Sequence, residues 1–197
     1  SSLFFVDRQR TFFSMFKKEG DIRLVVLDVR SAHNVGSLFR TADGAGVSVV
    51  HLVGYTPAPI DEFKRPRKDI TKVSLGAEIS VLWEHHKTLS PLIKKLQEDG
   101  YEIVALEQSC DSIDYRSFVP KSKKIALIVG NEVGGIPVSV IEKCDQVMEL
   151  PMLGKKESLN VGVAAGIALY ELNTKLDTTQ LFPLRLKGRL NHSDFQK

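Results

Sequence analysis

The sequence is poor in several features that would assign a protein to a class directly. It contains only two cysteines, Cys110 and Cys144, which are too few for a disulfide framework and lack the spacing of metal ligands. We expect each to be a small reduced residue of the core. No apolar run approaches the length that spans a bilayer, and no charged-then-apolar leader opens the chain. We therefore expect a soluble, cytoplasmic protein.

Motifs that bind nucleotide phosphates or metals are also missing. The glycine-rich stretch 130–137 has neither the G-x-G-x-x-G spacing of dinucleotide-binding proteins nor the G-K-[ST] ending of a P-loop. The adjacent pair His85 and His86 lacks the spacing of known ligand sets, so we interpret it as a surface feature and expect no metal site. The sequence shows no internal repeat and no low-complexity tract.

The composition is that of one globular domain. The chain has 197 residues, of which 43% are hydrophobic and 26% are charged, so it can bury a substantial core. The net charge of +3 is too small to establish a nucleic-acid partner. Basic residues nevertheless cluster within 64–68, 121–124 and 185–189. Any one cluster is more often a solvated face, but three together permit contacts to phosphates.

Short apolar runs alternate with helical patterns along the chain. The runs predict strands over 24–27, 47–53, 81–83, 103–106, 125–129 and 147–150. Helices are predicted over 34–45, from Ser90 to Gly100, over 137–143 and over 159–176, with a long loop after residue 53. This alternation predicts an α/β domain with a mostly parallel sheet over 23–176. We assign 1–22 to an N-terminal helical extension and 177–197 to a basic tail.

The loops that follow strands are expected to carry the chemistry, because ligands collect beyond the carboxyl ends of parallel strands. The first such loop leads to Asn34, with Arg40-Thr41-Ala42 further along the helix. The second runs from Gly130 to Gly135, and the third contains Ser158-Leu159-Asn160-Val161 before a helix rich in glycine and alanine. Each has a structural alternative: Asn34 and Ser158 could be helix caps, and the glycines could form a turn.

In their order and joint content, these loops resemble the SpoU/TrmH branch of the SPOUT methyltransferases. Asn34 with Arg40-Thr41-Ala42 is similar to the first motif of that family, and Gly130-Asn131-Glu132-Val133-Gly134-Gly135 to the second. Pro151-Met152 and Ser158-Leu159-Asn160-Val161 are similar to the third. The likeness runs from about residue 24 to about residue 172. It implies a domain whose C-terminal part is threaded as a trefoil knot.

The resemblance also implies a function, which is 2'-O-methylation of a ribose in structured RNA with S-adenosylmethionine as cofactor and a homodimer as the active form. We expect tRNA rather than rRNA as the substrate. The implied catalytic residues are Arg40, Asn34, Glu132, Ser158 and Asn160. Backbone groups at Leu106, Gly130, Leu150 and Leu159 are expected to hold the cofactor. Charge density alone assigns Lys64, Arg65, Arg67 and Lys68 to RNA binding.

Two other functions stay open at this point. The chain could be a catalytically silent RNA-binding relative, which the presence of Arg40, Glu132 and Asn160 argues against. It could also be a nucleotide-dependent oxidoreductase on an ordinary α/β sheet, which the missing phosphate fingerprint argues against.

Overall fold

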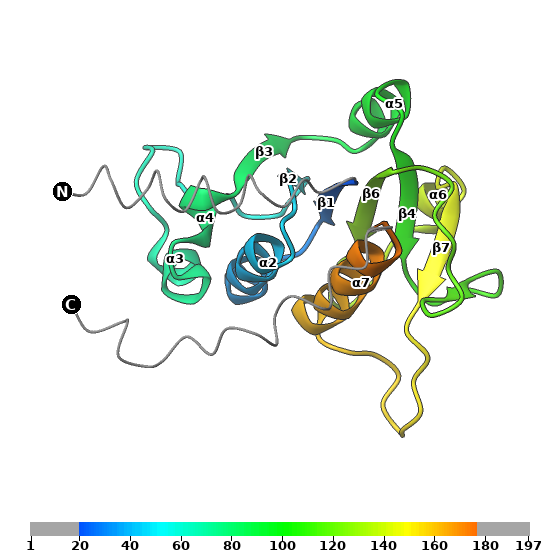
Figure 1. The fold of residues 1–197 in the computed structure, drawn as a ribbon. Coiled ribbons are helices and arrows are strands. Elements are labelled where there is room, and N and C mark those ends of the chain that lie inside the picture. Colours follow the sequence, from blue (N-terminus) through cyan, green and yellow to red (C-terminus); the bar gives the residue numbers. More distant parts are fainter. Residues whose placement is uncertain (1–19, 177–197) are drawn as a thin grey trace, which may run out of the picture.

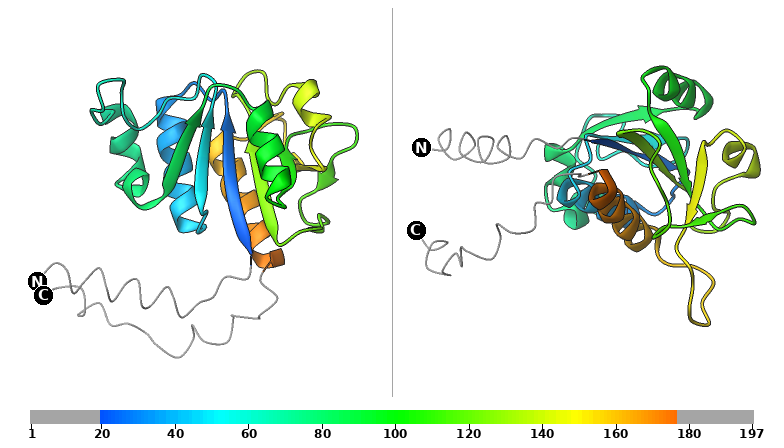
Figure 2. Two further views of the ribbon diagram at one scale, coloured as in Figure 1. Left: turned by 90° about the horizontal axis from the view of Figure 1, so that it is seen from above. Right: turned by 45° about the vertical axis from the view of Figure 1, so that its right-hand side comes forward.

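A single seven-stranded sheet with helices on both faces organises the chain (Figures 1 and 2). The computed structural model describes residues 20–176, so the basic tail and residues 1–19 of the predicted N-terminal extension lie outside the described residues. Residues 21 and 22, which were predicted to end that extension, belong to the first strand instead. The strands are β1 (Asp21–Leu27), β2 (Val49–Val53), β3 (Leu82–His86), β4 (Glu102–Leu106), β5 (Ile113–Asp114), β6 (Lys124–Val129) and β7 (Gln146–Glu149). The helices are α2 (Ala32–Gly44), α3 (Lys68–Ser74), α4 (Ala77–Ser80), α5 (Ser90–Glu98), α6 (Val138–Ile141) and α7 (Val161–Leu176).

The sheet has the strand order β3-β2-β1-β6-β4-β7-β5, and each of its strand pairings is parallel. This confirms the predicted α/β class with a parallel sheet. Because all strands point the same way, the loops after β1, β4, β6 and β7 emerge at the same end of the sheet, beyond the carboxyl ends of the strands. The two-residue strand β5 was not predicted, since it is too short to give an alternating pattern.

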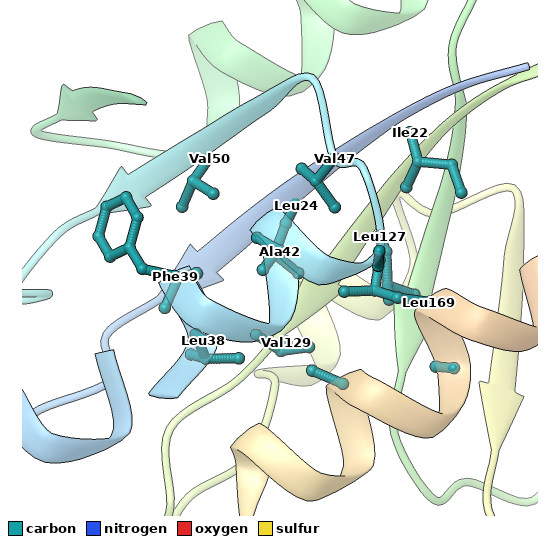
Figure 3. Packing of buried hydrophobic residues seen from close by; sticks show 14 of the residues in the cluster. Ile22, Leu24, Leu38, Phe39, Ala42, Val47, Val50, Leu127, Val129 and Leu169 are labelled. Carbon is teal, nitrogen blue, oxygen red and sulfur yellow. The ribbon is translucent and has the colours of Figure 1, made fainter. Parts of the chain in front are cut away.

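Two hydrophobic cores cover the two faces of the sheet. On one face, α2 and α7 pack over alternate residues of β1, β2 and β6, as Figure 3 shows for Leu24, Leu127 and Leu169. On the other face, α5 packs over the intervening residues, such as Val25 and Ile128. The near-continuous apolar runs in β1 and β6 follow from this double burial. Within residues 20–176, no helix combines the length and the apolar character that crossing a bilayer requires.

The segment after β2 differs from the sequence prediction, which placed a long loop there. It contains α3 and α4, which are only seven and four residues long and therefore give little periodic signal. Helix α3 packs closely on α2, because a Cβ at Gly36 would lie 2.7 Å from the carbonyl oxygen of Ile70. Glycine at position 36 is thus required by the approach of the two helices.

Two helix starts and one cysteine also correct the sequence predictions. Ser31, rather than Asn34, caps α2, and its hydroxyl accepts a hydrogen bond from the amide of Asn34. Helix α5 is preceded by Leu89, so Ser90 is its first residue and not its cap. Cys110 is exposed in the loop after β4, where no neighbouring element covers it, and is not a core residue.

Candidate active site

A cavity of about 640 Å³ opens where the loops after β4, β6 and β7 meet the amino end of α7. Eight of the nine residues that the sequence assigned to catalysis or cofactor binding line it. These are Asn34, Glu132, Ser158, Asn160, Leu106, Gly130, Leu150 and Leu159. Three separate sequence motifs, the first and third of which are 126 residues apart at Asn34 and Asn160, therefore meet at one place. The strand order explains this, because β1, β6, β4 and β7 are successive neighbours in the sheet.

A chain of hydrogen bonds joins one residue from each motif. Asn34 donates from Nδ2 to Oε1 of Glu132 at 2.9 Å and accepts at Oδ1 from Nδ2 of Asn160 at 3.0 Å. Asn160 in turn accepts at Oδ1 from the amide of Gly162 at 2.9 Å, which satisfies a donor in the first turn of α7. Asn34 is buried, so its amide orientation is fixed by partners on both sides. The hypothesis that Asn34 caps the helix is therefore wrong, and its side chain instead connects Glu132 to Asn160.

Glu132 also accepts hydrogen bonds from backbone amides of the loop after β1. Its two carboxylate oxygens accept from the backbone nitrogens of Arg30 and Ser31, each at 3.2 Å. Loss of water around the carboxylate opposes ionisation, but the hydrogen bonds from Asn34 and from these amides prevail and hold the pKa of Glu132 below its usual value. Because the pKa of Glu132 is lower in the folded state, its ionised carboxylate stabilises the fold at pH values above the ordinary pKa of 4.5. This contribution is lost as the pH falls below 4.5 and through the lowered pKa.

The turn between Gly130 and Gly135 folds back on itself. Asn131 accepts at Oδ1 from the amides of Val133 and Gly134, and it donates from Nδ2 to the carbonyl oxygen of Asp28 at 2.7 Å. Gly135 has φ of +61°, in the left-handed region that favours glycine. A Cβ at Gly130 would lie 2.5 Å from the carbonyl carbon of Gly135. Gly130 and Gly135 are thus required by the turn itself.

Replacing Gly130 by alanine is expected to destabilise the fold, because the added methyl group meets backbone atoms that cannot swing aside. Forced overpacking of this kind costs about 1–3 kcal/mol. Urea unfolding of Gly130→Ala measures the loss. Gly134→Ala is the matched control, since a Cβ at Gly134 meets nothing within 4 Å. Equal free energies of unfolding for the two variants would show that the turn is more pliable than its geometry indicates.

The walls of the cavity include residues that the sequence did not single out. Carboxylates are prominent among them: Glu107, Glu149 and Glu157 join Glu132, and no lysine or arginine is among the described residues that line the cavity. Glu107 accepts from the amide of Ile136 at 2.8 Å and so holds the motif turn against the end of β4. Glu107 follows Leu106 directly, so the rule that strand ends carry function would have identified it.

The small residues of α7 allow a close helix contact, as the sequence indicated. A Cβ at Gly162 would lie 2.8 Å from Oγ of Ser37 on α2. Tyr170 donates to the carbonyl oxygen of Gly44 at the far end of the same pair of helices. Because α7 lies directly against α2, Asn160 at the start of α7 reaches Asn34 near the start of α2 (Figure 1).

Arg40 is the one predicted catalytic residue that does not line the cavity. It is exposed on α2, six residues after Asn34, which places it about 240° around the helix. Within one chain, Arg40 therefore points away from the side of α2 that carries Asn34. A second hollow, of about 710 Å³, lies on the other side of Glu132 and is lined by Arg30, Ser31 and Gly134 among others.

The basic loop, defined as Lys64, Arg65, Arg67 and Lys68, is exposed but partly neutralised. Arg65 pairs with Asp61 and Arg67 with Asp69, each at 2.8 Å. Lys64 and Lys68 have no carboxylate partner within residues 20–176. The four residues are not part of either hollow near Glu132.

Parallel strands flanked by helices, with a cavity beyond their carboxyl ends, define a ligand-binding α/β protein. The chain belongs to the SpoU rRNA Methylase family, whose model matches residues 21–170. The tRNA (guanosine(18)-2'-O)-methyltransferase of Escherichia coli K12 is 26% identical over 92% of this chain and 75% of its own length. The 23S rRNA (guanosine-2'-O-)-methyltransferase of Salmonella typhi is 36% identical over 75% of this chain and 58% of its own length.

Solved structures agree with this assignment. The AdoMet-bound rRNA methyltransferase from Sinorhizobium meliloti is 31% identical with a TM-score of 0.70, over 79% of this chain and 57% of that one. The TrmH/SpoU tRNA modifying enzyme of A. aeolicus is 27% identical with a TM-score of 0.68, over 81% and 77%. The chain spans less than two thirds of the length of several curated relatives that it matches.

Proposed function

We propose that the protein methylates the 2'-hydroxyl of a ribose in RNA and uses S-adenosylmethionine as the methyl donor. The observation that carries this proposal is the convergence of the three family motifs on one cavity through the contacts of Glu132, Asn34 and Asn160. Membership of the SpoU family supports the reaction class. The unbroken series of hydrogen bonds through Glu132, Asn34 and Asn160 favours an active enzyme over a catalytically silent RNA-binding relative.

The cavity suits this cofactor in size and in charge. Its volume of about 640 Å³ lies within the usual range for a small-molecule site. Four carboxylates line it without any lysine or arginine among the described lining residues, which favours a cationic ligand and disfavours the anionic phosphates of NAD or ATP. Backbone groups at Leu106, Gly130, Leu150 and Leu159 would hold the adenosine part. When bound, S-adenosylmethionine supplies a methyl group activated by a sulfonium charge.

The residues of the chain then act mainly by positioning. Asn34 and Asn160 hold the loop of Glu132 and the start of α7 in a fixed relation, so the ribose oxygen meets a preorganised site. Glu132 and Ser158 shape the walls and contact the substrate. An arginine side chain is a poor general base because its guanidinium is positively charged in proteins, so the role of Arg40 is to stabilise negative charge that develops on the ribose oxygen.

We propose further that a homodimer completes the site. Arg40 is exposed and does not line the cavity of its own chain, and a second chain would bring such an arginine to the ribose. Val163, Ile167 and Tyr170 form an exposed stripe along α7, with 52%, 39% and 57% of their surfaces accessible. Apolar residues with this helical spacing suit a contact with a second copy. The stripe lies on the layer of α2 and α7 that also carries Arg40 (Figure 1).

As substrate we propose a tRNA. The tRNA-modifying relative from Escherichia coli matches a larger share of this chain, 92%, than the 75% matched by the rRNA-modifying relative from Salmonella typhi. Mapping 2'-O-methyl groups in RNA from cells with and without the protein tests the proposal. A missing methyl group in rRNA, with tRNA unchanged, would contradict it.

The C-terminal part is proposed to be threaded as a trefoil knot, as in the SPOUT fold that the motifs resemble. The loop after β7 is tied to the loop after β4, since Gln108 donates from Nε2 to the carbonyl oxygen of Glu157 at 2.8 Å. Helix α7 then returns to pack on α2, which lies on one face of the sheet (Figure 2). Tracing the chain in a crystal structure tests the threading.

Thermal unfolding provides a direct test of cofactor choice. S-adenosylmethionine at about a hundred times its Kd should raise the unfolding midpoint by roughly 5–10 °C, because a ligand stabilises the state that binds it. NAD and ATP should leave the midpoint unchanged, since their phosphates would face the carboxylates of the cavity. A shift with NAD but none with S-adenosylmethionine would overturn the proposal.

A further inference from the structure

Three metal-ligating side chains gather at the edge of the sheet opposite to the cofactor cavity. His51 lies on β2, and Glu84 lies directly opposite on the edge strand β3. His86 follows two residues later, so its side chain is on the same face of β3 as that of Glu84. The ligating atoms of the three residues all lie within 4.8 Å of one another.

The separations between these atoms match a tetrahedral metal site. Nδ1 of His51 lies 3.1 Å from Nε2 of His86, and Oε2 of Glu84 lies 3.5 Å and 3.3 Å from the two nitrogens. Ligands at 2.0–2.1 Å from a tetrahedral Zn²⁺ stand about 3.3–3.4 Å apart. The three separations therefore differ by only a few tenths of an ångström from those that one tetrahedral ion requires. Two histidines and one glutamate are also a ligand set that Zn²⁺ uses in proteins.

The surroundings leave the cluster ready for an ion and accessible to one. The side chain of His51 is 2% exposed, that of His86 is 26% and that of Glu84 is 54%, so one side of the cluster is open to solvent. Histidine binds a metal ion through a lone pair of its neutral imidazole, and the open side of the cluster gives an ion access to Nε2 of His86 and Oε2 of Glu84.

We propose that His51, Glu84 and His86 bind one divalent transition-metal ion, with Zn²⁺ as the best match, and that the ion fastens the edge strand β3 to β2. Three protein ligands leave a fourth position for water. The site lies on β2 and β3, and β1 separates these strands from β6 and the cavity, so the ion acts on the stability of the edge strand and not on methyl transfer. The alternative without an ion is a hydrogen bond between the two imidazoles.

Calorimetric titration of the metal-free full chain with ZnCl₂ tests this inference. We expect one ion per chain, with affinity reduced by about tenfold or more in His86→Ala and in Glu84→Gln, because each removes a ligand. Zn²⁺ should also raise the thermal midpoint of the wild type by roughly 5–10 °C at saturating concentration, and the variants should lose most of this rise. Titration with Co²⁺ should give the visible absorption of a tetrahedral site.

The matched control is His85→Ala. His85 lies between the two ligands of β3, but its Nε2 faces the carbonyl oxygen of Thr56 at 3.1 Å on the other side of the strand. This variant should bind Zn²⁺ like the wild type. Either of two results would overturn the inference: no saturable binding by the wild type, or equal affinities in the wild type, His86→Ala and Glu84→Gln, which would place the ion elsewhere on the chain.

Discussion

Mixing two inactive variants should restore methyl transfer, if each active site takes its arginine from one chain and its cofactor cavity from the other. Arg40→Ala removes the exposed arginine, and Ala164→Phe places a large side chain in the wall of the cavity. A mixed dimer then carries one complete site and one doubly defective site. Random re-association makes about half of all dimers mixed, so roughly a quarter of the wild-type rate returns. Each variant alone should lose at least about a hundredfold in turnover.

The separate readouts of the two variants make the result interpretable. Arg40→Ala should bind S-adenosylmethionine with nearly wild-type affinity because Arg40 does not line the cavity, whereas Ala164→Phe should lose this binding. Lys94→Ala is a control, since Lys94 is an exposed cation on α5 on the opposite face of the sheet and should not affect the rate. If the mixture stays inactive while mixed dimers form, each site lies within one chain. If Arg40→Ala keeps wild-type turnover, the catalytic assignment is wrong.

The sequence motifs predicted eight of the residues that line the cavity, but they did not predict that Arg40 lies outside it. Asn34, Glu132 and Asn160 were identified by motif, and strand-end loops in a parallel sheet converge for a general reason. Glu149 and Glu157 were missed because acidic residues at strand ends and in loops carry no periodic signal. Six residues at 100° each place Arg40 away from Asn34, and the helical repeat of one chain cannot indicate the second chain that we propose.

Long-range pairing explains the other gaps. His51 and His86 are 35 residues apart in the sequence, and only the register of β2 and β3 brings them together. The adjacent pair His85 and His86 drew attention in the sequence, yet alternation along a strand sends these two side chains to opposite faces. The short helices α3 and α4 escaped detection because their stability comes from packing on α2, as at Gly36, and not from an apolar pattern of their own.

In the basic loop, the two lysines should contribute more to RNA binding than the two arginines. Arg65 and Arg67 already hold Asp61 and Asp69, so an RNA phosphate must compete with a carboxylate for each guanidinium. Lys64 and Lys68 have no such competitor among the described residues. In a plot of log affinity against log salt concentration, losing both lysine contacts should reduce the magnitude of the slope by roughly 1.4–1.8, since each phosphate contact accounts for about 0.7–0.9.

Filter binding of tRNA across a range of salt concentrations measures this slope for Lys64→Gln/Lys68→Gln. The charge-matched control is Lys94→Gln/Lys143→Gln, which removes two positive charges from the opposite helical layer and should leave the slope unchanged. Phe63 is 68% exposed beside the loop, with the guanidinium of Arg65 over its ring at 4.8 Å, and this pair offers a surface on which an unpaired base can stack. Phe63→Ala should therefore weaken binding without changing the slope, because stacking releases no counterions. An unchanged slope in the lysine variant would show that the loop is only a solvated face, and RNA contacts would then be sought around Arg185, Lys187 and Arg189.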